Sequence, residues 1–156
     1  MVSFDIEGVP APRIRVPTYS RRGSLVTCYK TAVNDRRPKT VLVVDDETEL
    51  LDLFFVVLED KGYKIETATN GREGLKAVER RMPDLIVVDI RMPVMDGPEF
   101  AREFHARYGF RVPLVVLTAA PDARDSACAM GAVGWMCKPF ELNQLVHLVE
   151  EHIGAA

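Results

Sequence analysis

The chain has 156 residues, of which 47% are hydrophobic, so it is long enough and apolar enough to bury one domain core. Its net charge of -3 is unevenly divided: residues 1–39 carry eight Lys and Arg against three acids, and residues 40–156 carry twelve against twenty. No stretch approaches a membrane span, the first residues lack the apolar block of a signal peptide, and three scattered cysteines show no metal-ligand spacing, so we expect a cytoplasmic protein with free thiols.

Residues 1–39 predict an N-terminal extension rather than part of the core. Four prolines and few large apolar residues favour a basic, flexible arm. The alternative is a small hairpin, because residues 13–19 and 24–33 are rich in Val, Thr, Tyr and Ile and flank an Arg-Arg-Gly turn. The positive charge would suit nucleic acid or an acidic partner, but we expect a solvated tail that binds neither nucleic acid nor a membrane.

From residue 40 to residue 153 the pattern alternates strand and helix five times. Apolar or alternating runs predict strands at residues 41–45, 63–69, 85–88, 113–117 and 133–137. Helical spacing, with caps and stops such as Gly62 and Pro83, predicts helices at 48–61, 71–81, from 98 onward, 122–130 and 141–153. Such alternation predicts an α/β fold: a doubly wound, five-stranded parallel sheet with helices on both faces.

Polar side chains follow four of the predicted strands. Asp45 and Asp46 follow the first, Asp89 the third, Thr118 the fourth and Lys138 the fifth. The carboxyl ends of parallel strands meet at one edge, so we expect these side chains to converge there. Clustered carboxylates suit Mg²⁺, and an aspartate at a strand end can act as a nucleophile that forms an acyl phosphate. A Lys ammonium and a Thr hydroxyl could then share the phosphoryl oxygens.

Each of these residues also has a plainer explanation. Asp46 or Thr118 could cap the helix that follows it, and Lys138 could be a surface lysine. Trp135 could be partly buried packing rather than a functional residue. Three histidines, at positions 105, 147 and 152, fall on helices and are interpreted as surface residues.

Residues 40–153 resemble the receiver domain of two-component response regulators. Four segments carry the resemblance, in this order: Val-Val-Asp45-Asp46-Glu47, Asp89-Ile-Arg-Met-Pro-Val-Met-Asp96-Gly97, Val-Leu-Thr118-Ala and Lys138-Pro139-Phe140. The resemblance implies a flavodoxin-like fold with strand order 2-1-3-4-5. It also implies a phosphoacceptor aspartate at Asp89 and a Mg²⁺ site formed by Asp45, Asp46, Asp89 and the backbone carbonyl of Arg91.

The resemblance extends to the residues that would respond to phosphorylation. Thr118 and Lys138 would contact the phosphoryl oxygens, and the bond between Lys138 and Pro139 would be cis. Trp135 stands where the family usually has Tyr, Phe or a smaller residue that moves inward with Thr118. Thr118 and Trp135 are therefore the switch candidates, and the bulky indole of Trp135 departs from the family pattern.

The function implied is that of a single-domain response regulator. It would take a phosphoryl group onto Asp89 from a histidine kinase or phosphotransfer protein, with Mg²⁺, and would catalyse nothing beyond its own phosphorylation and dephosphorylation. It would signal by protein–protein contact through the fourth helix, fifth strand and last helix, which is also a candidate homodimer surface.

Three alternatives stay open. The chain could be a receiver cut from a longer regulator. It could be an aspartyl-phosphate phosphatase, although that family has Asp-x-Asp after its first strand and a cap over the site, neither of which the sequence offers. It could also be a nucleic-acid-binding protein that uses the basic arm.

Overall fold

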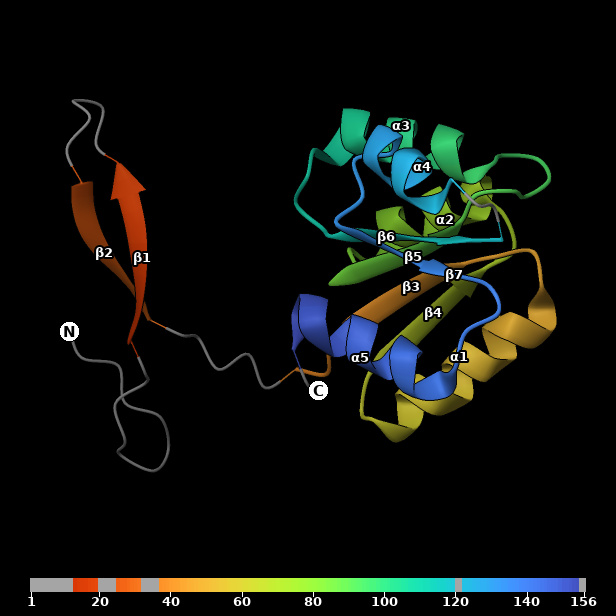
Figure 1. Ribbon diagram of the computed structural model, residues 1–156, viewed down its shortest axis with the longest axis horizontal. Helices are drawn as coiled ribbons and strands as arrows, with labels where there is room; N and C mark the ends of the chain where they lie inside the picture. Colours follow the sequence, from red (N-terminus) through yellow and green to blue (C-terminus); the bar gives the residue numbers. More distant parts are fainter. Residues whose placement is uncertain (1–12, 20–24, 32–36, 120–121, 155–156) are drawn as a thin grey trace. The chain divides into compact units, whose positions relative to one another are not determined.

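The computed structural model describes residues 13–19, 25–31, 37–119 and 122–154. The chain divides into two compact units, Met1–Arg37 and Pro38–Ala156. In the first unit, strands β1 (Arg13–Tyr19) and β2 (Leu25–Thr31) pair antiparallel over their whole length (Figure 1). The Arg-Arg-Gly expected to form the turn lies outside the described residues.

The second unit alternates strand and helix, as the sequence predicts. Its elements, which begin and end close to the expected positions, are β3 (Thr40–Val44), α1 (Thr48–Asp60), β4 (Lys64–Ala68), α2 (Gly71–Arg80), β5 (Leu85–Asp89), α3 (Gly97–Tyr108), β6 (Leu114–Thr118), α4 (Ala123–Ala129), β7 (Gly134–Cys137) and α5 (Leu142–Ile153). No helix among the described residues is both long enough and apolar enough to cross a membrane.

The five strands of this unit form one parallel sheet in the order β4-β3-β5-β6-β7. Counted from β3, this is the order 2-1-3-4-5, so the flavodoxin-like fold is confirmed. Helices α1 and α5 cover one face of the sheet, and α2, α3 and α4 cover the other (Figure 1). Strands β3, β5 and β6 lie in the interior of the sheet, and all of their residues are buried.

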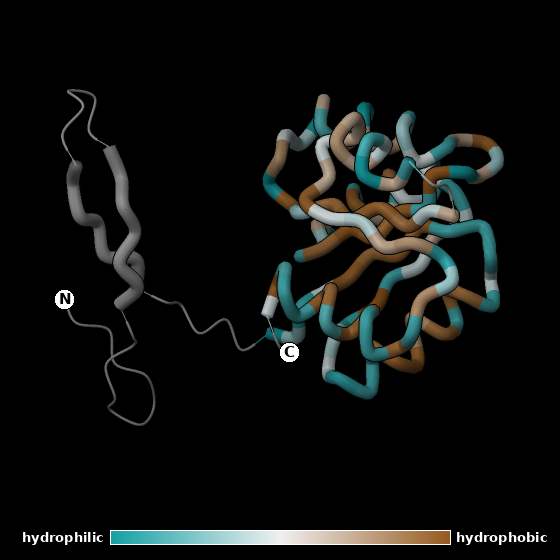
Figure 2. Tube along the Cα trace, viewed as in Figure 1, coloured by the Kyte–Doolittle hydropathy of each residue, from teal (hydrophilic) through white to brown (hydrophobic). Residues whose placement is uncertain are grey.

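The core has two layers because successive residues of a strand point to opposite faces. In β3, Leu42 and Val44 pack beneath α2, α3 and α4, whereas Val41 and Val43 pack beneath α1 and α5. Figure 2 shows the central strands as the most hydrophobic part of the unit, with hydrophilic residues on the outer sides of the helices. A strand that is buried on both faces must be apolar at every position, which is why the unbroken runs predict the interior strands correctly.

Two side chains, of Asn70 and Glu73, fix the start of α2. Asn70 caps α2 by accepting the backbone N–H of Glu73 at 3.0 Å. The Glu73 carboxylate accepts from the hydroxyl and the backbone N–H of Thr69, at 2.9 and 3.3 Å, rather than from the backbone N–H of the N-cap residue Asn70 as in a capping box.

Candidate functional site

Lys138 joins three carboxylates at the carboxyl edge of the sheet. Its Nζ lies 2.7 Å from Asp45 Oδ2, 3.0 Å from Asp89 Oδ1 and 2.9 Å from Glu47 Oε1. The backbone N–H of Lys138 donates to the carbonyl of Thr118 at 2.8 Å, which fixes the end of β7 beside the end of β6. The peptide bond between Lys138 and Pro139 is cis, as the resemblance implies. Lys138, whose side chain is 16% exposed, is therefore part of a charge cluster and not a surface lysine.

Asp45 and Asp89 are held in similar ways by the backbone that follows them. Asp45 is fully buried, and its Oδ1 accepts the N–H of Glu47 at 2.9 Å. The side chain of Asp89 is 10% exposed, and its Oδ2 accepts the N–H of Arg91 at 2.7 Å. Each carboxylate thus has one oxygen on a backbone amide two residues ahead and the other on the Lys138 ammonium. Both side chains are fixed before any ligand arrives.

Burial and ion pairing act on the protonation of this cluster in opposite directions. Burial raises the pKa of Asp45 above its usual value, and hydrogen bonds from Lys138 and from the Glu47 amide oppose that rise. Burial by itself would lower the pKa of Lys138, but its hydrogen bonds to Asp45, Glu47 and Asp89 outweigh this and raise it. The ammonium therefore keeps its charge at neutral pH and can face an incoming anion.

A hollow of about 360 Å³ opens beside Asp89. It is lined by Asp46, Glu47, Asp89, Ile90, Arg91, Thr118 and Ala119. The carboxylate of Asp89 is thus accessible at the base of a hollow with an acidic rim. Four of the six residues expected at the site line this hollow, and Lys138 and Asp45 adjoin it through their contact with each other and with Asp89.

The plainer explanations for Asp46 and Thr118 do not hold in the structure. The N-cap of α1 is Glu47, and the N-cap of α4 is Asp122. Asp46 is exposed on the rim of the hollow, whereas Thr118 is only 2% exposed at the end of β6. Neither residue is needed to start the helix that follows it.

The three aspartates predicted to hold a metal are not gathered into one ligand group. Among the described residues, no three His, Cys, Asp or Glu side chains are grouped so that they could hold a metal ion. The ammonium of Lys138 lies between Asp45 and Asp89, and Asp46 lies apart on the rim. Two carboxylates, Asp46 and Asp89, nevertheless share the hollow with the backbone of Arg91.

The loop after β5 sets the position of Asp89. The N–H of Ile90 donates to the carbonyl of Leu117 at 3.3 Å, and the N–H of Gly97 donates back to the carbonyl of Ile90 at 3.0 Å. A Cβ at Gly97 would lie 2.3 Å from the carbonyl oxygen of Asp89, so the backbone of the loop approaches too closely for any side chain. Val94, at the tip of the loop, has a φ of 71°.

Trp135 lies on β7, half-exposed at 43%, and is not part of the hollow at Asp89. It lines a separate hollow with residues of α5, among them Gln144, His147 and Leu148. A side chain in this position is neither core packing nor free in solvent. Its predicted role in a switch stays a prediction.

Sequence reasoning missed two residues. Glu47 belongs to the quoted motif but was given no role, although its carboxylate contacts Lys138. His105 was wrongly interpreted as a surface histidine: its ring nitrogens lie 3.2 Å from the Gly109 carbonyl and 3.0 Å from the Met130 carbonyl, and its ring stacks on Phe110. Gly109 and Phe110 are near neighbours of His105 in the sequence, but Met130 lies 25 residues from His105 and Lys138 lies 91 residues from Glu47, so no local signal marks these two contacts.

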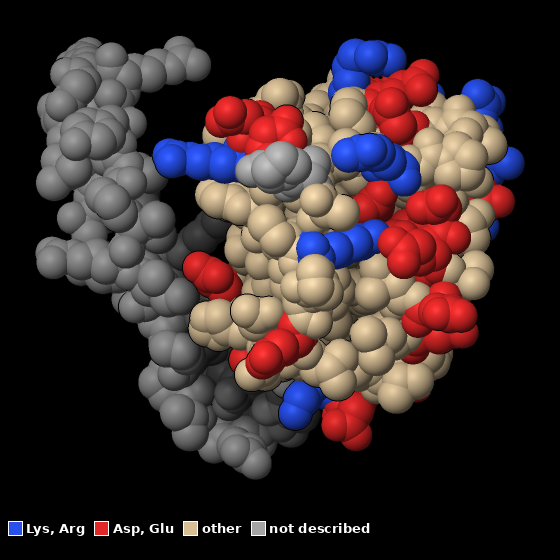
Figure 3. Space-filling model, turned by 45° about the vertical axis from the view of Figure 1, so that its right-hand side comes forward, with Lys and Arg blue, Asp and Glu red and all other residues tan. Residues whose placement is uncertain are grey.

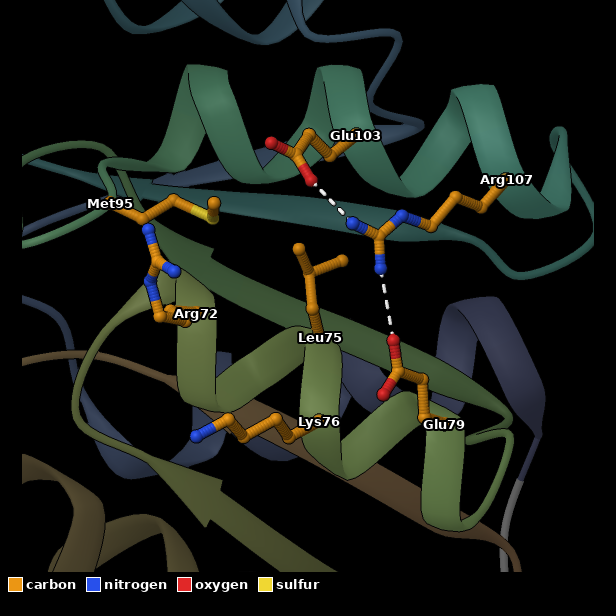
Figure 4. A pocket seen from close by; sticks show the side chains of 7 residues that line it. All are labelled: Arg72, Leu75, Lys76, Glu79, Met95, Glu103 and Arg107. Atoms are coloured by element: carbon orange, nitrogen blue, oxygen red, sulfur yellow. Dashed lines mark hydrogen bonds and ion pairs between the residues drawn. The ribbon is translucent and has the colours of Figure 1, made fainter.

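A further hollow, of about 440 Å³, lies between α2 and α3 and contains none of the predicted site residues. Figure 4 shows Arg107 reaching across it to Glu79 on α2, at 2.9 Å, while it also pairs with Glu103 on its own helix, at 2.7 Å. The pair with Glu79 links α3 to α2, whereas the pair with Glu103 lies within α3. We interpret this hollow as a helix–helix groove whose charges are largely satisfied.

The fold and the site together define a class of protein. A doubly wound sheet presents a lysine-paired aspartate at the end of its central strand, beside a hollow with hard oxygen groups on its rim. Such an arrangement suits a small anionic group together with a hard cation.

Comparisons with known proteins give the family. The response regulator receiver domain model matches residues 41–150. The alkaline phosphatase synthesis transcriptional regulatory protein PhoP of Bacillus subtilis is 38% identical over 109 residues, which are 69% of this chain and 45% of PhoP. The DNA-binding response regulator MtrA of Mycobacterium tuberculosis is 33% identical over 121 residues, 76% of this chain and 52% of MtrA. The chain spans about half the length of these relatives. It belongs to the response regulator receiver domain family.

Solved structures agree with this assignment. The chemotaxis response regulator CheY4 of Vibrio cholerae superposes with a TM-score of 0.69 at 33% identity, over 74% of this chain and 99% of CheY4. The receiver domain of the sensor histidine kinase PA1611 from Pseudomonas aeruginosa, which was solved with magnesium in its active-site cleft, gives a TM-score of 0.69 at 29% identity, over 76% of this chain and 100% of that domain.

Proposed function

We propose that Asp89 accepts a phosphoryl group from a phosphohistidine of a histidine kinase or phosphotransfer protein. The observation that carries the proposal is the environment of the Asp89 carboxylate. It is fixed by the Arg91 amide and the Lys138 ammonium and opens onto a hollow large enough for a phosphoryl group. In the transfer, one Asp89 oxygen forms a bond to phosphorus while the bond between phosphorus and the donor nitrogen breaks, and the donor leaves as histidine.

The neighbouring residues stabilise the charge on the transferred group. Lys138 is already beside Asp89 and would donate to one phosphoryl oxygen. Thr118 lines the same hollow and would donate its hydroxyl to another. In phosphoryl transfer most of the catalysis comes from positioning and charge stabilisation, so these two groups, both at strand ends, supply what the chain itself contributes.

Mg²⁺ fits the donor set of the hollow. The ion keeps several waters and usually binds one or two carboxylates together with a phosphate, and it accepts only hard oxygen ligands. Asp46, Asp89 and the backbone carbonyl of Arg91 are such ligands and share one hollow. Asp45, fully buried with both oxygens already bonded, would support the site by holding Lys138. The ion would neutralise the charge that collects on the phosphoryl oxygens.

Phosphorylation would be transmitted by protein–protein contact. A phosphoryl group that attracts the Thr118 hydroxyl would shift the end of β6. On the adjacent strand β7, Trp135 pairs with Val116, which lies two residues before Thr118. We propose that such a shift would move the half-exposed Trp135 and so change the surface formed by α4, β7 and α5, which is also the candidate homodimer surface. We propose that the receiver acts on its own in this way; the alternative is that the chain is a receiver fragment of a longer regulator.

Intact mass after incubation with acetyl phosphate and Mg²⁺ tests the proposal. We expect a single phosphoryl adduct that does not form when EDTA is present to remove Mg²⁺ and is absent from Asp89→Asn. Trp135 is the only tryptophan in the chain, so its fluorescence in the same sample reports the switch. An adduct that persists in Asp89→Asn, or no adduct with acetyl phosphate or any of a panel of histidine kinases, would contradict the proposal.

The same samples test the rivals. Release of phosphate from an excess of a free phosphomonoester, over many turnovers, would favour a phosphatase. Nucleic-acid binding that falls steeply with salt and is lost on removal of residues 1–39 would favour a role for the basic arm. The receiver unit itself is acidic, and on the face shown in Figure 3 its basic side chains lie among acidic ones, so we expect no binding there.

A further inference from the structure

Lys138 has no spare hydrogen to offer a phosphoryl group. An ammonium donates three hydrogen bonds, and Lys138 has three carboxylate acceptors within 3.0 Å, on Asp45, Glu47 and Asp89. A phosphoryl oxygen on Asp89 that binds Lys138 must therefore replace one of them. The three acceptors differ in what their release would cost.

Breaking the contact between Lys138 and Asp45 would cost the most free energy. It is fully buried, and a buried carboxylate that loses its cation is left with an uncompensated charge. Asp89 carries the phosphoryl group itself and stays beside Lys138. Glu47 is different, because its side chain is 63% exposed and water can take over its hydrogen bonds.

The place of Glu47 at the start of α1 does not explain where its carboxylate lies. Glu47 is the N-cap of α1, yet its side chain makes no capping hydrogen bond. Its backbone carbonyl accepts from Leu50 and Leu51, and its backbone N–H donates to Asp45, while its carboxylate turns to Lys138 and lines the hollow beside Asp89.

We propose that Glu47 is a positioning residue that holds the third donor of Lys138 before phosphorylation and is the partner exchanged for a phosphoryl oxygen. Its carboxylate competes with the phosphoryl group for the ammonium and adds a negative charge to the mouth of the hollow. Glu47 therefore slows phosphorylation of Asp89 and keeps the lysine in place while the site is empty of phosphate. This inference rests on the proposed function of Asp89.

Two variants of the full chain separate this role from simple surface charge: Glu47→Ala and the matched control Glu49→Ala. Glu49 is an exposed acid in the first turn of α1, two residues further on. Neither side chain is buried, so both variants should fold. Hydrogen exchange of the Lys138 ammonium, followed by ¹⁵N NMR without any phosphodonor, tests the contact itself. We expect exchange to become about fivefold faster in Glu47→Ala and to stay unchanged in Glu49→Ala.

The rate of phosphorylation by acetyl phosphate with Mg²⁺, followed by intact mass, tests the exchange of partners. We expect it to rise about fivefold in Glu47→Ala and less than about twofold in Glu49→Ala. Unchanged ammonium exchange in Glu47→Ala overturns the contact. Equal rates in the two variants, or a slower rate in Glu47→Ala, overturn the competition. If the wild type takes no phosphoryl group, the proposed function and the exchange step both fail, while the ammonium measurement still decides the contact.

Discussion

Similar chemical groups lie at the two edges of the receiver sheet, where the strands end and where they begin, but they have different roles. At the carboxyl edge, three carboxylates surround one ammonium, and the cluster has more negative than positive charge. At the amino edge, the hydroxyl of Tyr63 donates to the Gly154 carbonyl at 2.7 Å, and the ammonium of Lys39 donates to the carbonyl of Ile153. These groups satisfy the last carbonyls of α5, which the helix itself leaves without partners.

The difference shows where stability and function separate. Polar groups at the amino edge donate hydrogen bonds to the end of α5 and so attach it to the sheet. Each of these bonds should therefore stabilise the fold. At the carboxyl edge, groups of like charge are held close together because the reaction needs them there. Functional sites of this kind commonly lower the stability of the fold. Removing a polar group from the amino edge should therefore lower stability, whereas removing a negative charge from the cluster at the carboxyl edge should raise it.

The largest loss is expected from Gly97→Ala, at the carboxyl edge. A Cβ there would meet the Asp89 carbonyl at 2.3 Å and the Ile90 Cα at 3.0 Å, and backbone atoms cannot move aside as a flexible side chain can. We expect the free energy of unfolding to fall by about 3 kcal/mol in urea titrations, and phosphorylation to slow because Asp89 is displaced. Pro98→Ala, at the exposed neighbouring position, is the control and should cost less than about 1 kcal/mol. A stable Gly97→Ala with normal phosphorylation would show that the loop is not rigid.

At the amino edge, Tyr63→Phe should lower the free energy of unfolding by about 1.5 kcal/mol, because it leaves the Gly154 carbonyl without its hydroxyl donor. Tyr108→Phe is the control, since that half-buried ring packs on Phe104 and should change little. Equal losses in the two variants would argue that the bond to Gly154 does not stabilise the fold.

Tyr63 also gives the amino edge a pH dependence. Burial, with a smaller effect from Glu150, raises the pKa of Tyr63 above its usual value of 10.0. The folded state therefore holds the proton to higher pH than the unfolded state. The resulting stability is fully present below pH 10.0 and is lost as pH rises from there through the folded pKa. Over that alkaline window the wild type should lose more stability than Tyr63→Phe, and parallel pH profiles would contradict this.

At the carboxyl edge the opposite sign is expected from Asp89→Asn. Burial is the main cause of the raised pKa of Asp45, and the charge of Asp89 adds a smaller contribution, because two neighbouring carboxylates repel each other. Removing that charge should raise the free energy of unfolding by about 1 kcal/mol while abolishing phosphorylation. Asp96→Asn, on the same loop, is the control: Asn caps α3 as well as Asp does, so stability should not change. A destabilised Asp89→Asn would remove the contrast between the two edges.

The smallest effect is expected at Val94, where a β-branched residue adopts a φ of 71° on an exposed loop. Val94→Gly should raise the free energy of unfolding by about 0.7 kcal/mol, because Gly adopts this conformation without strain. The control is Val133→Gly, which is also exposed but has an ordinary negative φ and should be destabilised. If both variants lose stability, the strain at Val94 is negligible.

Much of this molecule follows from local patterns in the chain. The apolar runs of β3, β5 and β6 predict interior strands because both faces of those strands are buried. The end of each run places a polar residue at the carboxyl edge, so Asp45, Asp89, Thr118 and Lys138 could be assigned to one site before the fold was known. The cis bond before Pro139 and the strand order came from the resemblance, since nothing in the residue pattern fixes either.

Which of those residues form ion pairs with each other depends on the tertiary structure alone. The sequence presents Asp45 and Asp46 as equivalent neighbours, yet one is fully buried against Lys138 and the other is exposed. It gives no sign that Glu47 meets a lysine 91 positions away, or that His105 reaches the carbonyl of Met130. Periodicity fixes which face of an element a side chain occupies, but a contact between two elements depends on how they are packed and registered against each other. That information exists only once the chain has folded.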